Sequence, residues 1–165
     1  MSPIVVNPET YFSRFVRSGD PLLQELEAEA HAENIPIVGP LVGELLFILA
    51  RALSARSVLE LGTATGYSAI YLARACALNS GRLTTIEMDP RLAARARKNL
   101  ERAGLGPHAT VVCGAADEGV TALAGPFDLI FLDIDKAGYA GVLGGCRRLL
   151  RTDGLLIADN VAFPD

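Results

Sequence analysis

The chain has 165 residues, of which 50% are hydrophobic and 21% are charged, and its formal net charge at pH 7 is −4. This length allows one domain with a full core, and this composition excludes an intrinsically disordered chain. The acidic balance gives no electrostatic basis for binding a nucleic-acid backbone, and no apolar run approaches the ~20 residues that cross a bilayer.

The first 39 residues predict a helical cap region. We expect a short helix around Tyr11–Arg17 and a longer one from Pro21 to about Glu33, followed by a breaker-rich linker at Asn34–Pro40. The first residues do not show the charged-then-apolar pattern of a secretory leader, which favours a cytoplasmic protein.

A helix is predicted from Pro40 to about Leu53, because proline is tolerated in a first helical turn. Its apolar run contains Glu44 and Arg51, so we interpret it as a buried amphipathic helix. A second cluster of charge, Arg91–Arg102, has spacings that place its basic side chains on the solvated face of a helix.

The three cysteines, Cys76, Cys113 and Cys146, lack CxxC spacing and each lies in an apolar segment. We expect free, buried thiols in a reducing cytoplasm. His31 and His108 are isolated from the cysteines in sequence, which argues against a zinc site.

From Ser57 onward, short apolar runs alternate with helical stretches. Strands are predicted near 57–61, 82–87, 109–113, 127–132 and 154–158, and helices near 67–77, 90–103, 116–123 and 137–150. Runs such as FDLIFLD are apolar on successive residues, which is typical of strands covered on both faces. The predicted fold is therefore an α/β three-layer sandwich with a mostly parallel sheet and right-handed crossovers.

Each predicted strand runs into an acidic residue or a glycine. These residues are Glu60 with Gly62, then Glu87, Gly114, Asp133 and Asp159. In an open parallel sheet, ligands bind beyond the carboxyl ends of the strands, so we expect a single pocket there.

The loop after the first strand indicates which ligand binds. A dinucleotide fingerprint requires G-x-G-x-x-G, but Ala64 occupies the second glycine position and Tyr67 the last, which makes a dehydrogenase the least favoured interpretation. The E-x-G-x-x-x-G pattern of Glu60, Gly62 and Gly66 instead resembles motif I of the class I S-adenosylmethionine-dependent methyltransferases, which have a Rossmann-like fold.

This resemblance implies contacts with S-adenosylmethionine. Glu60 or nearby backbone is expected to meet the ammonium group, while Gly62 and Gly66 admit the amino-acid and ribose portions. Glu87 ends the second strand, where its two carboxylate oxygens can accept both ribose hydroxyls. Met88 is expected to pack on the adenine ring, and Gly114 and Ala115 to line its edge.

Two later motifs make the resemblance specific. The segment Phe127–Tyr139, which reads FDLIFLDIDKAGY, and the segment Ala158–Val161, which reads ADNV, resemble the cation-dependent O-methyltransferases of the catechol and caffeoyl-CoA type. The match runs from about Ile37 to Val161 and has GTATGYSA and TIEMD in the expected order.

Membership of that family implies a metal site and a catalytic base. Asp133, Asp159 and Asn160 would bind one divalent cation, normally Mg²⁺, and their hard oxygen atoms suit it. Lys136 would take the proton from the hydroxyl that is methylated, and Asp133, as a ligand of the metal that lowers the pKa of that hydroxyl, would be the second catalytic residue.

The resemblance implies further contacts with S-adenosylmethionine, the methyl donor, and a class of molecule that accepts the methyl group. Tyr67 and Ser68 would contact the methionine carboxylate, the backbone of Val38 would meet the amino-acid end, and Asp133 would also border the donor. The acceptor would be a small hydroxylated aromatic molecule, catechol-like or caffeoyl-like, and the protein a homodimer.

Members of the family continue beyond the Asp-Asn motif through a helix and two further strands. We therefore expect one domain, 1–165, with a cap region at 1–39 and a donor-binding core at 40–165 in which the C-terminal strands are missing. An engineered truncation, omitted residues and a naturally short protein all explain this. Two rival functions remain: a non-catalytic, donor-binding or dimerising module, and a nucleic-acid methyltransferase, which the acidic charge disfavours.

Overall fold

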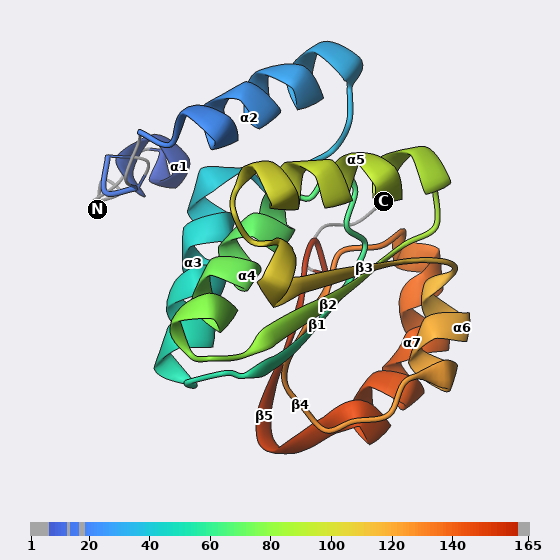
Figure 1. Ribbon diagram of the computed structural model, residues 1–165. Helices are drawn as coiled ribbons and strands as arrows, with labels where there is room; N and C mark the ends of the chain where they lie inside the picture. The colour runs from blue at the N-terminus through green and yellow to red at the C-terminus, as the bar shows by residue number, and fades with distance from the viewer. Residues whose placement is uncertain (1–6, 13, 17–18, 162–165) are drawn as a thin grey trace.

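Five parallel strands form one sheet in the order β3-β2-β1-β4-β5 (Figure 1). The computed structural model describes residues 7–12, 14–16 and 19–161. The strands are β1 (Ser57–Leu61), β2 (Arg82–Glu87), β3 (Ala109–Cys113), β4 (Phe127–Leu132) and β5 (Leu150–Ala158). The helices are α1 (Pro8–Phe12), α2 (Pro21–Glu33), α3 (Gly39–Ala52), α4 (Tyr67–Leu78), α5 (Pro90–Arg102), α6 (Ala116–Ala122) and α7 (Lys136–Leu149), with a 3₁₀ turn η1 (Gly106–His108).

Helices cover both faces of the sheet, which confirms the predicted three-layer α/β fold. The α3, α4 and α5 helices lie on one face, and α6 and α7 lie on the other (Figure 1). Successive residues of β1 point to opposite faces, so that Val58 packs in the core beside α4 while Leu59 packs in the core beside α7. This double burial explains why the central strands are apolar at nearly every position.

The predicted elements match the structure to within a few residues except at two places. The last strand begins at Leu150, four residues before the expected start, because α7 runs into it without a loop and Leu150 pairs with Phe127. At the other end, helix α1 covers Pro8–Phe12 and is followed by a turn, so the helix expected around Tyr11–Arg17 is wrong in position. Residues 13 and 17 of that segment lie outside the described residues.

The α3 helix is less buried than its composition suggests. Gly43, Leu46 and Ala50 face the core, but Leu45 and Ile48 on the opposite side are each about half exposed, at 51% and 52%. The interpretation of a buried helix is therefore wrong for that face, because α3 lies at the outer surface of its layer (Figure 1). Within the part of the chain that the structure describes, no helix combines the length and apolar character that crossing a bilayer requires.

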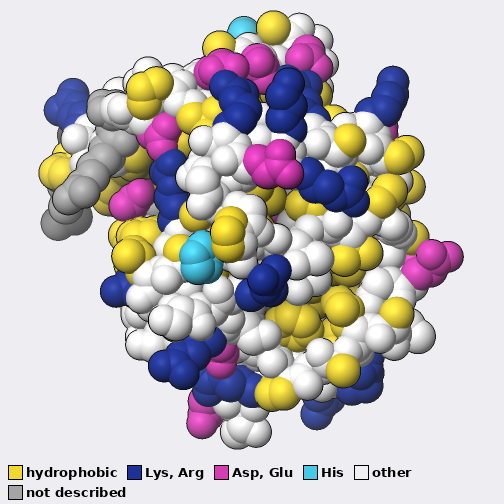
Figure 2. Space-filling model, viewed as in Figure 1, with side chains coloured by type: hydrophobic (Ala, Val, Ile, Leu, Met, Phe, Trp, Pro, Cys, Tyr) yellow, Lys and Arg dark blue, Asp and Glu magenta, His cyan; other side chains and the backbone are white. Residues whose placement is uncertain are grey.

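Ion pairs attach α2 to the body of the protein. Arg95 of α5 contacts Glu29 and Glu33 at 2.7 Å each, and Arg102 contacts Glu25 at 2.6 Å. Figure 2 shows this as acidic side chains of α2 facing a row of basic side chains near the top of the molecule. The expectation of a solvated basic face on Arg91–Arg102 is thus wrong for Arg95, which α2 partly covers, whereas Arg102 stays exposed beside its partner Glu25.

The three cysteines are free thiols, as expected, but they differ in burial. Cys76 and Cys146 are buried, whereas Cys113 is exposed. Cys113 lies at the end of β3, an edge strand with its outer residues uncovered, so the expectation of three buried thiols is wrong at this position.

Asp128 joins three segments at the amino-terminal end of the sheet. Its Oδ2 atom accepts hydrogen bonds from the backbone N–H groups of Arg56 and Ser57 at 2.7 and 2.9 Å, and its Oδ1 atom accepts one from Arg151 Nε at 2.7 Å. Burial alone would raise the pKa of Asp128, but these three donors outweigh it and lower the pKa. The charged form of Asp128 therefore stabilises the fold.

We expect Asp128→Asn to reduce the free energy of unfolding by about 1–3 kcal/mol at neutral pH, because the amide cannot replace a charged acceptor of three donors. A carboxyl with a lowered folded pKa contributes stability above its unfolded pKa of about 4, and the contribution is lost as the pH falls through the folded pKa. Urea unfolding from pH 7 to pH 3 should show the two proteins converging in acid. Asp153→Asn, at an exposed position, is the control; an equal loss in both variants would contradict the prediction.

Candidate active site

The candidate site lies where β1 and β4 end side by side and the strand order reverses. Gly62 follows β1 and donates its N–H to Ile86 O at 3.0 Å, and Asp133 follows β4 and donates its N–H to Leu61 O at 2.8 Å. Gly62 has a φ of +94°, and a Cβ atom built there would lie 1.9 Å from the carbonyl oxygen of Asp133. Only glycine fits, so the two backbones can approach each other closely.

The loop between β1 and α4 is held in a fixed shape by hydrogen bonds to its backbone groups. Gly66 has a φ of +89° and donates its N–H to Thr63 O at 2.8 Å before α4 begins. From the neighbouring α5, Asn99 Nδ2 donates to Thr65 O at 2.9 Å. These contacts position the loop beyond the carboxyl end of the sheet, where the sequence predicted a ligand.

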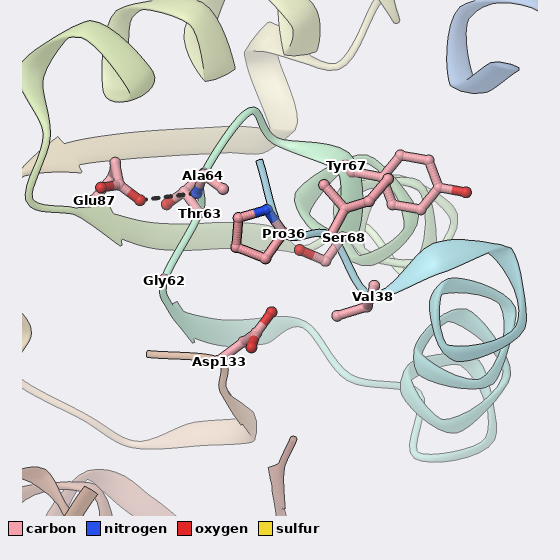
Figure 3. Close-up of a pocket in the computed structure, with 10 residues that line it drawn as sticks. Pro36, Val38, Gly62, Thr63, Ala64, Tyr67, Ser68, Glu87 and Asp133 are labelled. Atoms are coloured by element: carbon pink, nitrogen blue, oxygen red, sulfur yellow. Dashed lines mark hydrogen bonds between the residues drawn. The ribbon is translucent and has the colours of Figure 1, made fainter. Parts of the chain in front are cut away.

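Glu87 connects this loop to the tip of β2. Its Oε2 atom accepts from the N–H of Ala64 at 2.8 Å, and its Oε1 atom accepts from the N–H of Asp89 at 2.9 Å. Figure 3 shows Glu87 and Asp133 approaching the same opening from two different strand ends. Each carboxylate oxygen of Glu87 keeps a free lone pair for a ligand hydroxyl.

Two cavities meet at this point. The smaller one, about 100 Å³, lies beside the start of α4 and is lined by Pro36, Ile37, Val38, Gly62, Thr63, Ala64, Tyr67, Ser68, Glu87 and Asp133 (Figure 3). The larger one, about 500 Å³, extends along α7 and is also lined by Gly62, Glu87 and Asp133, together with Met88, Gly114 and Ala115. The structure thus brings together nine of the predicted donor-binding residues.

The other two predicted donor-binding residues, Glu60 and Gly66, line neither cavity. Glu60 is fully buried behind the loop, where its Oε2 atom accepts a hydrogen bond from Thr85 at 2.5 Å. Among the described residues its Oε1 atom is buried with no hydrogen-bond partner. Burial raises the pKa of Glu60 to about 7, with the charges of Asp133 and Glu87 adding to the effect. Gly66 acts through backbone conformation, since its φ is +89° and a Cβ atom built there would lie 3.2 Å from the α-carbon of Ala96 in α5.

Sequence reasoning missed part of the cavity lining. Pro36 and Ile37 come from the connector between α2 and α3, which only tertiary packing places here. Asp117, Ile134 and Gly138 line the larger cavity. These residues lie directly after a strand end or in the first turns of α6 and α7. Those positions could have indicated a role in the cavity, because ligands bind near such helix starts.

Tyr67 joins the loop to the cap region. Its hydroxyl donates to Glu27 Oε1 of α2 at 2.5 Å, and its ring lies 5.6 Å from that of Tyr71. Burial and the adjacent Glu27 carboxylate raise the pKa of Tyr67, so the phenol stays protonated. The hydroxyl of Tyr67 therefore points away from the cavity, and its ring forms part of the wall (Figure 3).

The predicted metal ligands lie at the adjoining tips of β4 and β5. Asp133 and Asn160 line a third cavity together with Lys136, the first residue of α7. Asp159 does not line it, but its carboxylate is near enough to Asp133 that burial and the charge of Asp159 raise the pKa of Asp133 to about 6. Within the described residues no cluster of three His, Cys, Asp or Glu side chains suited to a metal exists, so this set of two carboxylates and one amide is the candidate.

The family follows from comparison with known proteins. A sequence profile of an O-methyltransferase family matches residues 16–164. The chain belongs to this O-methyltransferase family.

Two curated relatives are catechol O-methyltransferases. The one from Niastella koreensis is 45% identical over 75% of this chain and 58% of its own length, and the one from Mycobacterium tuberculosis is 41% identical over 86% of this chain and 66% of its own. The chain thus spans less than two thirds of the length of either relative.

Two solved O-methyltransferases share the fold. The Bacillus cereus enzyme in complex with SAH is 35% identical, with a TM-score of 0.83 over 92% of this chain and 71% of its own. TomG from Streptomyces achromogenes, involved in tomaymycin synthesis and in complex with SAM, is 30% identical, with a TM-score of 0.83 over 94% of this chain and 76% of its own. The α/β fold described above therefore matches these two O-methyltransferases over the part of each that this chain covers.

We expect Gly62→Ala to disrupt the site of this family member, because the added methyl group would overlap the carbonyl of Asp133 at a φ that disfavours alanine. The free energy of unfolding should fall by about 1–3 kcal/mol, the range for strained backbone. Thermal unfolding measures this. Gly144→Ala is the matched control, since nothing lies within 4 Å of the added Cβ and alanine favours a helix. Equal stability of Gly62→Ala and the wild type would contradict the close approach.

Proposed function

We propose that this chain is the donor-binding core of an S-adenosylmethionine-dependent O-methyltransferase that uses a divalent cation, normally Mg²⁺, and acts on a catechol-like hydroxyl. The observation that carries the proposal is the position of Asp133, which borders both cavities next to the loop and also the cavity that contains Asn160 and Lys136. A donor site and an acidic site therefore share one residue. The catechol O-methyltransferase relatives and the SAM- and SAH-bound structures support this assignment.

The two cavities beside the loop fit the two halves of the donor. Glu87, held by two backbone N–H groups, would accept the ribose hydroxyls. Met88, Gly114 and Ala115 line the larger cavity and would contact the adenine. Val38, Tyr67 and Ser68 line the smaller cavity and would surround the methionine portion.

Glu60 would act on the donor through charge. It lies behind the wall, with Thr85 bonded to one carboxylate oxygen and the other oxygen unpartnered among the described residues. A cationic ammonium group in the smaller cavity would stabilise the ionised form of Glu60, which burial otherwise disfavours. Glu60 would thus stabilise the ammonium group electrostatically. The sequence had suggested direct contact between Glu60 and that group as one alternative.

The residues at the β4 and β5 tips fit a hard divalent cation. Asp133, Asp159 and Asn160 offer oxygen ligands, and the two carboxylates repel each other until positive charge is placed between them. When bound, the cation would lower the pKa of a chelated catechol hydroxyl and orient it.

Lys136 is the proposed proton acceptor. It lines the same cavity as Asp133 and Asn160, at the first position of α7, where Asp135 caps the helix by accepting from the N–H of Ala137 at 3.3 Å. The cap fixes the start of α7 and hence the direction of the Lys136 backbone. The protein would supply proximity, proton removal and charge neutralisation, and the donor would give its methyl group directly to the acceptor oxygen.

The decisive test is methyl transfer to a panel of catechols with Mg²⁺ and with excess EDTA. We expect EDTA to abolish transfer by the wild type, and Asp133→Asn to lower the rate about 100-fold while binding SAH more nearly normally. Asp153→Asn, at an exposed position, is the control.

Equal activity in EDTA would contradict the cation role. Tight SAH binding with no transfer to any catechol would instead favour a non-catalytic, donor-binding module.

We expect Glu87→Gln to weaken SAH binding about tenfold, because loss of charge-assisted hydrogen bonds to the loop and to the ribose costs about 1.5 kcal/mol or more. Isothermal titration calorimetry measures the affinity. Glu118→Gln, on the exposed side of α6, is the control. An unchanged affinity for SAH in Glu87→Gln would contradict the ribose assignment.

A further inference from the structure

We infer that Tyr139 is a positioning residue for the cation site, whose hydroxyl group holds together the tips of β4 and β5. The inference rests on the proposed function, since it concerns the residues that would bind the cation. Tyr139 lies on α7, one helical turn after Lys136, and lines the cavity that contains Asp133 and Asn160.

The hydroxyl of Tyr139 lies between the two strand ends. Its oxygen is 2.8 Å from Asp159 O and 3.2 Å from Leu132 O, so the hydroxyl can donate to either carbonyl. The carbonyl of Leu132 also accepts the N–H of Asp159 at 2.9 Å. The Tyr139 hydroxyl therefore contacts the same Leu132 carbonyl that accepts the last backbone hydrogen bond between β4 and β5.

The two carbonyls belong to the backbone that carries the proposed cation ligands. Leu132 directly precedes Asp133, and Asp159 directly precedes Asn160. Strand pairing ends at Leu132 and Ala158, and Asn160 adopts a left-handed φ of +56° as the chain turns. β5 is an edge strand in the described sheet, so on the side away from β4 no described strand supports Asp159. The hydroxyl of Tyr139 supplies a contact where the sheet no longer does.

Like charge at the two tips adds to the need for this contact. Asp133 and Asp159 are carboxylates that directly follow paired residues of β4 and β5, and their mutual repulsion favours separation of the two tips. The Tyr139 hydroxyl donates a hydrogen bond to the backbone of one tip or the other, which opposes that separation without neutralising either carboxylate. Tyr139 thus preserves the ligand spacing before a cation binds.

The aromatic ring of Tyr139 has a separate role from its hydroxyl. Tyr139 is partly buried and packs against the core cluster on the α7 side of the sheet. Tyr139→Phe keeps this ring and removes the oxygen alone, so the fold should be retained. The substitution isolates the proposed positioning effect.

The test compares cation and donor affinity in Tyr139→Phe, with Mn²⁺ as the spectroscopic probe. We expect water-proton relaxation to show Mn²⁺ binding about tenfold weaker than in the wild type, as for other residues that orient metal ligands. SAH affinity by calorimetry and the melting temperature should be nearly unchanged, and backbone exchange at Asp159 should be faster. Tyr11→Phe, at a tyrosine that lines none of the three cavities described above and is 42% exposed, is the control.

The possible outcomes distinguish failure of this inference from failure of the proposed function. Equal Mn²⁺ affinity in Tyr139→Phe and wild type overturns the inference, as does a parallel loss of Mn²⁺ affinity, SAH affinity and melting temperature, which indicates a general structural role. A wild type that binds no Mn²⁺ refutes the cation role and the inference with it. A wild type that binds Mn²⁺ but methylates no catechol refutes only the acceptor, and weaker Mn²⁺ binding by the variant still supports the inference.

Discussion

The close approach of Gly62 to the backbone of Asp133 is the constraint on which the site depends. Parallel strands diverge in their connections where the strand order reverses, and this opens a crevice at their carboxyl ends. Here the absence of a side chain at Gly62 lets the loop after β1 touch the tip of β4. The loop and the acidic tip consequently form one continuous wall, so a ligand of the loop and a ligand of Asp133 would necessarily be neighbours.

Negative charge concentrates behind and along that wall. Burial raises the pKa of Glu60 to about 7 and that of Asp133 to about 6. The Glu87 carboxylate lies beside them and accepts hydrogen bonds from two backbone N–H groups. Maintaining several ionised carboxylates in a poorly solvated region is unfavourable unless cations approach them. The proposed ligands, a sulfonium donor with an ammonium group and a divalent cation, would supply that positive charge. The same electrostatic repulsion that opposes folding of the site would therefore favour binding.

The sequence predicted the sheet and the strand-end residues because both follow from local pattern. Continuous apolar runs such as Phe127–Leu132 indicate strands buried on two faces, and an acid or glycine after each marks the ligand-binding edge. It did not predict contacts between distant segments, such as Pro36 at the cavity or the pairing of Arg95 with Glu29 and Glu33. Nor did periodicity show that Cys113 lies on an edge strand, because strand order is a property of the whole sheet.

The cap region is attached beside the smaller cavity by polar contacts together with a few side chains of the shared core. α2 buries just three side chains, Leu23, Leu26 and Ala30, while ion pairs and the Tyr67–Glu27 hydrogen bond fix its acidic side. Exposed ion pairs contribute little individually, so the position of α2 depends on several of them acting together with this small apolar contact. Since α2 leads directly into the connector that carries Pro36 and Val38, the shape of the smaller cavity is determined by these pairings as well as by the sheet. The wall beside the proposed methionine portion is thus less rigidly supported than the wall formed by Gly62 and Asp133.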